Sequence, residues 1–309
     1  MSMRNNKGYV RYVRTVLLLV FVVILAGSVV RTTHSGMGCP DWPTCFGRII
    51  PPMNAGQLPK DYEKYLKRQD IDHTFNAFHT WVEYVNRLLT GVLGLAIVAL
   101  IVYSYKKIYR SRPSIFWLSV LLMVIVVVES LLGWLIVRTN LRVDTVTVHL
   151  LPIFVLAGIC VLMIHKAEGS YRIQDKMLKW ISTIALLLVL LQVLVGTQVR
   201  TSVDITSKAL QYTGREKWLS HTGAILTIHE ILAWLSSFAC VFLFWRSLSY
   251  PRLQKLGFLL LVLVVGELAM GFTLVKMDFP AFAQPVHLVL GSAILVAIFS
   301  YRLYFRKRK

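Results

Sequence analysis

The residues best suited to chemistry in this sequence are histidines that lie in long apolar segments. His149, His229 and His287 each lie within such a segment, and His79 lies near the start of another. Ionisable side chains inside a membrane are costly and usually mark a functional site. Imidazole nitrogens bind haem iron, and a six-coordinate iron takes two axial ligands. A lone histidine can equally be a packing residue, so the prediction depends on how the histidines pair.

The histidines belong to an internal duplication. One repeated motif is short: Gly27-Ser-Val-Val-Arg31-Thr32 matches Gly196-Thr-Gln-Val-Arg200-Thr201. The other is a set of four residues with the same spacing of four, five and eleven in both halves: Glu129, Gly133, Arg138 and His149, then Glu267, Gly271, Lys276 and His287. Repeats of this kind predict two similar units in the same membrane orientation, each with a similar site.

Pairing across helices gives two candidate haem sites. His229 and His287 fall in the outer third of two different apolar segments, as a haem iron held between two helices requires. His149 occupies the place of His287 in the first half. Its expected partner, at the position equivalent to His229, is Asn86.

The first site therefore has an open ligand question. His79, Glu83 and Asn86 are spaced by four and three residues, so they project from one face of a helix. His79 is either an alternative iron ligand, which leaves Asn86 without that role, or a hydrogen-bonding residue at the helix start, with His149 the sole protein ligand. Glu83 is a candidate for proton handling, and its alternative role is a buried partner of Arg87.

Basic residues recur at the predicted outer ends of four helices: Arg31, Arg138, Arg200 and Lys276. At that level they are placed to bind haem propionates through charge-assisted bonds. Snorkelling to the membrane interface is the alternative. Glu129 and Glu267 are expected to face a helix contact or the wall of a cofactor site rather than to be catalytic.

The elements that carry these residues are predicted to be transmembrane helices. The 309 residues are 56% hydrophobic and 16% charged, a composition typical of membrane proteins. Apolar runs long enough to span about 30 Å of hydrocarbon lie at 13–30, 78–103, 115–137, 146–164, 178–199, 222–245, 253–275 and 285–304. We therefore expect an all-α membrane protein of eight helices, arranged as two pseudo-symmetric four-helix bundles.

The connecting segments set domains and orientation. We expect an N-terminal bundle at 1–170, with a long outer loop at 32–77, and a C-terminal bundle at 171–309. Most of the 34 Lys and Arg residues fall on the side of the termini, so both termini are predicted to be cytoplasmic. The first apolar run is expected to remain as a span rather than be a cleaved signal peptide. The charge of +19 lies in clusters between spans and does not indicate nucleic-acid binding.

Two of the four cysteines, Cys39 and Cys45, lie in the long outer loop, whereas Cys160 and Cys240 lie within spans. The loop faces an oxidising compartment, where disulfides persist. A structural disulfide that stiffens the loop and a redox-active thiol pair are both compatible with this position.

The outer-loop sequence Ser35-Gly-Met-Gly-Cys-Pro-Asp-Trp-Pro-Thr-Cys-Phe-Gly47, the Glu83-x-x-Asn-Arg87 segment and the paired histidines resemble the haem A synthase family. The resemblance covers essentially the whole chain. It implies a plasma or inner membrane enzyme that oxidises a methyl group of haem O to a formyl group in two hydroxylations, with haem b as cofactor. The family usually has histidine where this chain has Asn86.

The resemblance also implies which half of the chain binds the cofactor and which half binds the substrate. It implies that the C-terminal half holds haem b through His229 and His287, and that the N-terminal half receives haem O. An electron donor, the haem O synthase and further copies of the chain are the partners to consider. A di-haem cytochrome b-type subunit is the alternative, but such proteins place two ligands on one helix, a pattern absent from the predicted spans.

Overall fold

The computed structural model describes residues 3–66, 74–139, 141, 143–169 and 173–305. Part of the predicted outer loop, at 67–73, and the predicted domain boundary at 170 lie outside these residues. Eight helices in the described residues are long and apolar enough to cross a membrane, which confirms the predicted class. They are α1 (Met3–Thr32), α3 (Ala77–Lys107), α4 (Pro113–Arg138), α5 (Val143–Glu168), α6 (Lys176–Ala209), α7 (Ala224–Ser247), α8 (Pro251–Lys276) and α9 (Ala283–Leu303).

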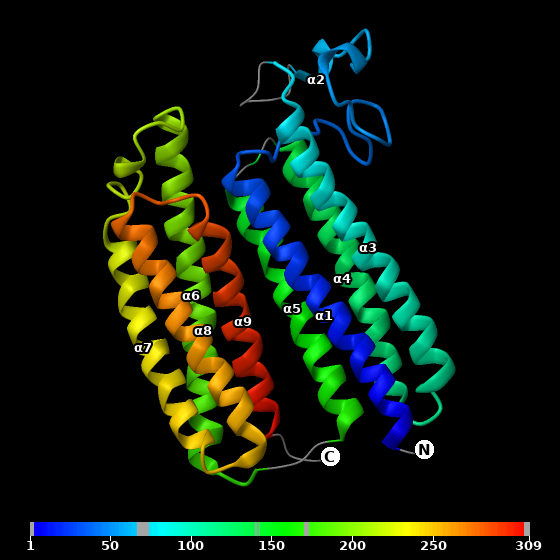
Figure 1. Cartoon of the computed structure of the whole chain (residues 1–309), viewed down its shortest axis with the longest axis vertical. Coiled ribbons are helices and arrows are strands. Elements are labelled where there is room, and N and C mark those ends of the chain that lie inside the picture. The colour runs from blue at the N-terminus through cyan, green and yellow to red at the C-terminus, as the bar shows by residue number, and fades with distance from the viewer. Residues whose placement is uncertain (1–2, 67–73, 140, 142, 170–172, 306–309) are drawn as a thin grey trace. The chain divides into compact units, whose positions relative to one another are not determined.

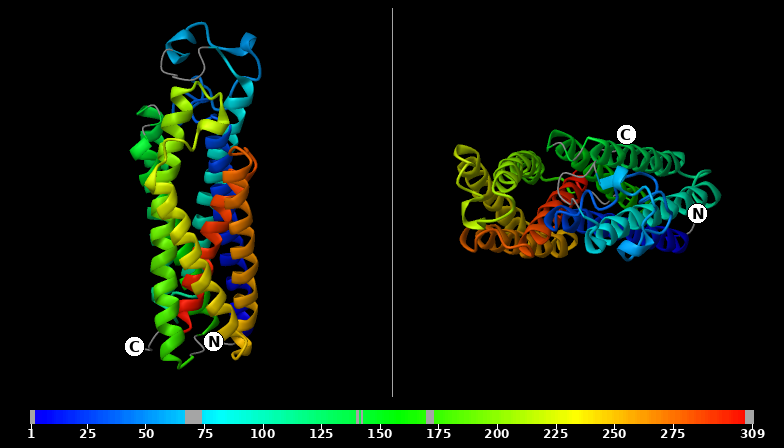
Figure 2. Two further views of the ribbon diagram at one scale, coloured as in Figure 1. Left: turned by 90° about the vertical axis from the view of Figure 1, so that its left-hand side faces the viewer. Right: turned by 90° about the horizontal axis from the view of Figure 1, so that it is seen from above.

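The chain divides into two compact units, Met1–Glu168 and Gly169–Lys309. In the first unit, α1 and α4 each pack against both α3 and α5. In the second unit, α6 and α8 each pack against both α7 and α9. Within each unit the four long helices therefore run alongside one another in a ring (Figures 1 and 2). A pseudo-symmetric relation between the units stays a prediction.

Local sequence signals explain where several helices begin. The Asn76 side chain accepts a hydrogen bond from the His79 backbone N–H (3.2 Å) at the start of α3. Asp175 accepts one from the Leu178 backbone N–H (2.9 Å) at the start of α6. These side chains satisfy backbone donors that have no partner within the first turn. Pro113 lies in the first turn of α4, where its missing N–H costs nothing.

Small and hydroxyl-bearing residues lie where helices meet. The Tyr9 hydroxyl lies 2.9 Å from the Ser104 hydroxyl, which joins α1 to α3. A Cβ atom on Gly257 would lie 2.0 Å from the Ser247 hydroxyl, so α7 and α8 approach closely at their connected ends. Large apolar side chains such as Leu18 and Phe238 are exposed, as expected for a surface that faces lipid.

The end of α6 differs from the prediction. The apolar run stops near residue 199, and Arg200 was expected at the helix end, but the helix continues to Ala209. Arg200 pairs with Asp204 (2.8 Å, one turn later), and the Val203 side chain is fully buried. The apolar run ends near residue 199 because polar residues begin there. The helix continues because buried side chains keep the helical spacing beyond that point. At 34 residues, α6 is about 50 Å long, which exceeds the hydrocarbon core.

The extension of α6 belongs to an apolar cap on the second unit. A buried cluster joins Val203 of α6 to Leu274 of α8 and Ala283 of α9, together with Trp218 and Phe279 from the connecting segments. The Trp218 indole N–H donates to the Thr213 carbonyl (2.9 Å). This cap fixes the outer ends of α6, α8 and α9, which carry the candidate site.

Candidate functional site

In the second unit, His229 of α7 and His287 of α9 face each other. Their ring centroids are 6.3 Å apart, and the ring planes make an angle of 73°. A metal–imidazole bond is about 2 Å long, so two nitrogens on opposite sides of one metal lie about 4 Å apart. Adding the radius of each ring gives a centroid separation close to the observed value. The two side chains are therefore spaced as axial ligands of a single metal.

Neighbouring residues leave room for these rings and supply polar contacts. A Cβ atom on Gly196 of α6 would lie 2.9 Å from His229 Cε1, and one on Gly271 of α8 would lie 3.6 Å from His287 Cε1. The Gln192 side-chain nitrogen lies 3.4 Å from His229 Nε2. The Glu267 carboxyl lies 3.2 Å from His287 Nδ1. All four helices of the unit thus contribute to one site.

Buried polar atoms around the histidines fit the binding of a cofactor between them. Among the described residues, the atoms without a hydrogen-bond partner include Gln192 Oε1, His229 Nδ1 and Glu267 Oε2. Such atoms are rare in native structures and call for an explanation. In the same residues, no group of three or more His, Cys, Asp or Glu side chains could hold a bare metal ion. Two axial histidines fit haem, because the porphyrin supplies the other four ligands.

The close approach of Gly196 to His229 makes a testable prediction. We expect Gly196→Ala to push the His229 ring aside and to weaken cofactor binding, because the added Cβ would lie only 2.9 Å from Cε1. The haem content of the purified protein measures this. Gly91→Ala is the control, since nothing lies within 4 Å of a Cβ atom at that position of α3. Equal haem content in the two variants would contradict the prediction.

The first unit has a related but unequal arrangement. His149 Nδ1 of α5 lies 2.7 Å from a Glu129 carboxyl oxygen of α4, and a Cβ atom on Gly133 would lie 3.9 Å from the His149 ring. The buried Asn86 Oδ1 of α3 has no hydrogen-bond partner in the described residues, and a Cβ atom on Gly27 of α1 would lie 3.8 Å from it. Asn86 therefore faces the glycine that corresponds to Gly196, as His229 does in the second unit.

The structure also places His79, the other candidate iron ligand, and the four basic residues predicted to bind haem propionates. His79 is in the first turn of α3, where its backbone packs against Gly38, and its role as an iron ligand stays a prediction. Arg31 lies in the last turn of α1. Arg138 and Lys276 are exposed and end α4 and α8. Arg200 contacts Asp204 and the Gln284 side chain.

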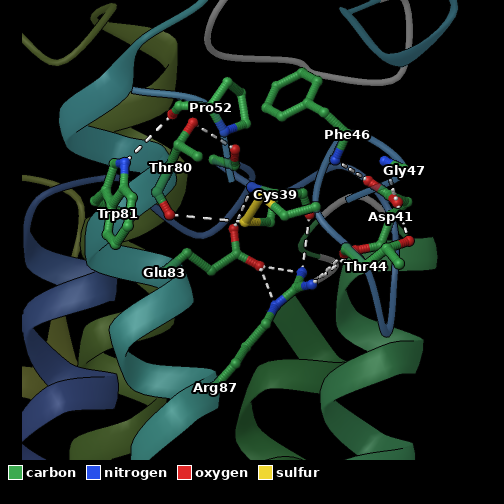
Figure 3. Close-up of a disulfide and its surroundings, with 12 residues drawn as sticks. Cys39, Asp41, Thr44, Phe46, Gly47, Pro52, Thr80, Trp81, Glu83 and Arg87 are labelled. Carbon is green, nitrogen blue, oxygen red and sulfur yellow. Dashed lines mark hydrogen bonds and ion pairs between the residues drawn. A yellow bond between two sulfur atoms is a disulfide. The ribbon is translucent and has the colours of Figure 1, made fainter. Parts of the chain in front are cut away.

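Glu83 and Arg87 clamp the outer loop onto α3 (Figure 3). Glu83 is buried, accepts a hydrogen bond from the Cys39 backbone N–H (2.8 Å) and forms an ion pair with Arg87. Arg87 donates to the backbone carbonyls of Cys39 (2.9 Å), Asp41 (2.7 Å) and Thr44 (3.0 Å). The alternative role of Glu83, as a buried partner of Arg87, is therefore present. Its role in proton handling stays a prediction.

The loop segment that Arg87 holds is ordered by its own side chains. Cys39 and Cys45 form a disulfide, which confirms the predicted bond, and both residues are buried. Asp41 accepts hydrogen bonds from the Phe46 N–H (2.6 Å) and the Gly47 N–H (2.9 Å). Phe46 is fully buried with the disulfide. The Cys-Pro-Asp-Trp-Pro-Thr-Cys-Phe-Gly motif thus builds a compact turn whose carbonyls face α3.

Arg87→Lys should release this turn. A lysine has no planar fork with which to reach three carbonyls and a carboxylate together, and each lost charge-assisted bond is worth about 1.5–3 kcal/mol. We expect faster proteolysis of the outer loop and a lower melting temperature. Arg14→Lys is the control, because the ion pair of Arg14 with Glu168 is exposed and such pairs contribute about 0.2–1 kcal/mol. Equal proteolysis of both variants would argue against the clamp.

Sequence reasoning missed two features of the site. Glu129 and Glu267 contact the candidate ligand histidines directly, whereas the sequence placed them only at a helix contact or at the wall of a cofactor site. The equal interval from glutamate to histidine in both repeats does not show how the two helices are rotated. Arg87 binds loop carbonyls, which no spacing rule indicates, since its acceptors are main-chain atoms more than forty positions away.

A family model described as cytochrome oxidase assembly protein (COX15-CtaA) matches residues 10–299. The chain belongs to this family. The match spans all eight apolar helices, both candidate sites and the clamped loop, so the membership of the cytochrome oxidase assembly protein family applies to the fold as a whole and confirms the resemblance noted in the sequence.

Individual relatives in this family are distant. A protein named haem A synthase from Sphingopyxis alaskensis is 26% identical over 333 aligned positions, covering 95% of this chain and 90% of that protein. Haem A synthases from Bartonella bacilliformis (29% identical) and Shewanella oneidensis (27%) match 47% and 48% of this chain. The chain covers only 42% and 43% of the length of those two relatives.

Proposed function

We propose that the chain is a haem A synthase, an enzyme that oxidises a ring methyl group of haem O to a formyl group. Two successive hydroxylations of that methyl give a geminal diol, and loss of water gives the aldehyde of haem A. The proposal is supported by membership of the family, by the names of the relatives and by the two histidine sites. The observation that carries it is the facing pair of His229 and His287 among buried polar atoms that lack partners in the described residues.

The second unit is the proposed cofactor half, at 171–309. His229 and His287 would hold haem b, while Arg200 and Lys276 are assigned to its propionates. Held by these two histidines, haem b would supply reversible one-electron transfer. The protein's own contribution is to hold the two rings apart at a fixed distance and to enclose them in apolar helices.

The first unit is the proposed substrate half, at 1–170. His149 binds the haem O iron, with His79 or Asn86 on the other side, and Arg31 and Arg138 bind the propionates. Glu83 handles protons during the oxidation, from a position directly beneath the disulfide turn. The clamped turn would keep water away from the substrate methyl group, which protects the oxidation from side reactions.

The protein's setting follows from its eight spans. We assign it to the plasma or inner membrane with both termini cytoplasmic, because Lys and Arg concentrate on that side. Haem O then enters from the membrane, with the haem O synthase as the supplying partner. An electron donor and further copies of the same chain are the remaining partners in this proposal.

The deciding experiment combines cofactor analysis with a turnover assay. We would purify the full chain anaerobically, measure the pyridine haemochrome spectrum, and then supply haem O, a reductant and oxygen. We expect one resident haem b and conversion of haem O to haem A. Chromatography of the extracted haems measures the conversion. Protein without haem would refute the proposal, and haem without conversion would favour the di-haem electron-transfer alternative.

A further inference from the structure

We infer that Glu267 and Glu129 are positioning residues that set the orientation of the iron-binding histidines His287 and His149. This inference rests on the proposed haem sites. Each carboxyl group lies beside Nδ1 of its histidine, so Nε2 is the nitrogen that remains for iron. The role is distinct from packing between helices, because it acts on the electronic character of the ligand.

The contact occurs once in each half of the internal duplication. Glu129 of α4 lies 2.7 Å from His149 Nδ1 of α5, and Glu267 of α8 lies 3.2 Å from His287 Nδ1 of α9. In both units the carboxyl comes from the helix that precedes the histidine helix. The same contact is present in both repeats although most of their other residues differ, which argues against a chance contact.

Burial makes the histidine the natural partner of each carboxyl group. The Glu129 side chain is 9% exposed and the Glu267 side chain 22% exposed, within apolar spans. A carboxyl group there is costly unless it is paired. The second oxygens, Glu129 Oε1 and Glu267 Oε2, are buried and have no hydrogen-bond partner in the described residues. The histidine contact is thus the main compensation visible for placing these carboxyl groups inside the bundle.

Glycines keep space for this arrangement in the second unit. Gly271, one turn after Glu267, lies against the His287 ring. Gly291, one turn after His287, lies against the carboxyl itself, because a Cβ atom there would be 2.9 Å from Glu267 Oε1. A larger residue at position 291 would move the carboxyl group away from its present place.

The chemistry follows from general behaviour of metal-bound histidine. A carboxyl group that accepts the Nδ1 proton's hydrogen bond fixes the tautomer and the ring orientation, and it makes Nε2 a stronger donor. A stronger donor favours the oxidised iron and lowers the reduction potential. Removal of such an outer partner typically weakens binding about 10–100-fold.

The experiment uses the full-length protein and three matched substitutions: Glu267→Gln, Glu129→Gln and Glu230→Gln. Glutamine keeps the size of the side chain and removes the charge. Glu230 is the control, because it is exposed and adjoins His229 in sequence. We would measure the midpoint potential of the resident haem b by anaerobic spectroelectrochemical titration, and the affinity for haem O by absorbance titration.

We expect Glu267→Gln to raise the midpoint potential while Glu230→Gln and Glu129→Gln leave it unchanged. Glu129→Gln should instead weaken haem O binding by about 10–100-fold. If Glu267→Gln does not fold, Gly291→Ala displaces the same carboxyl with its charge retained, and the potential should again rise.

Two results would overturn the inference while the proposed function stands: an unchanged potential in Glu267→Gln and Gly291→Ala, or an equal rise in Glu230→Gln. Wild-type protein without any haem would instead overturn the proposed function, and this inference with it.

Discussion

Replacing His287 with alanine is expected to abolish the haem b absorbance of the purified protein. His287 and His229 are spaced as the two axial ligands of one iron, at 6.3 Å between ring centroids. Removal of one leaves the iron with a single protein ligand and leaves the Glu267 carboxyl without its histidine. The loss should exceed the roughly 10–100-fold effect of an outer-shell partner. Absorbance and pyridine haemochrome content of anaerobically purified protein measure it.

His229→Ala should give the same result, since the two ligands act as a unit. His221→Ala is the matched control, because His221 is exposed in the turn before α7 and contacts the neighbouring Ser220 hydroxyl. That variant should retain the full spectrum. An unchanged haem spectrum in His287→Ala would remove the basis for placing haem b in the second unit.

Glu83→Gln is expected to stop haem O conversion while leaving the resident haem b in place. General acid–base groups contribute about 10²–10⁴-fold to rate, so conversion should fall by at least about 100-fold. The haem b spectrum should not change, because Glu83 and the His229 and His287 pair belong to different units. Haem O conversion and haem b content, measured on the same preparation, test both statements.

The two roles of Glu83 separate when Glu83→Gln is compared with Arg87→Lys. Glutamine can still accept the hydrogen bond from the Cys39 N–H, so the loop should stay resistant to protease if that contact is sufficient. An inactive variant with a protected loop would identify a proton-handling role. An inactive variant with a digested loop would assign Glu83 to the clamp. Normal conversion would exclude the proton-handling role.

The membrane fold could be predicted from the sequence because hydropathy alone locates spans. Six of the eight apolar runs lie within the helices found, while the runs at 222–245 and 285–304 extend beyond the start of α7 and the end of α9 by two residues and one residue. The end of α6 could not be located this way, because the last three turns carry polar residues while their buried face, including Val203, continues the helical spacing. Hydropathy indicates which residues of a helix lie in the hydrocarbon core of the membrane. The length of α6 also depends on packing in the apolar cap around Val203.

The site was partly predictable for a different reason. Histidines stand out in apolar segments, so His149, His229 and His287 could be selected by type and repeat. The partners of the histidines could not, because the contact of Glu267 with His287 depends on how α8 and α9 are rotated. The contacts of Glu83 and Arg87 with the loop could not be predicted for the same reason. Sequence spacing placed Glu83 beside Arg87 but not beneath Cys39.

The hydrogen bonds from Arg87 to the disulfide turn affect which substitutions this region can tolerate. Arg87 reaches main-chain oxygens at three positions, and main-chain oxygens do not depend on residue identity. The contact with Arg87 therefore places no requirement on the identity of Trp42, which is partly exposed. A substitution of Arg87, by contrast, would release every acceptor at once.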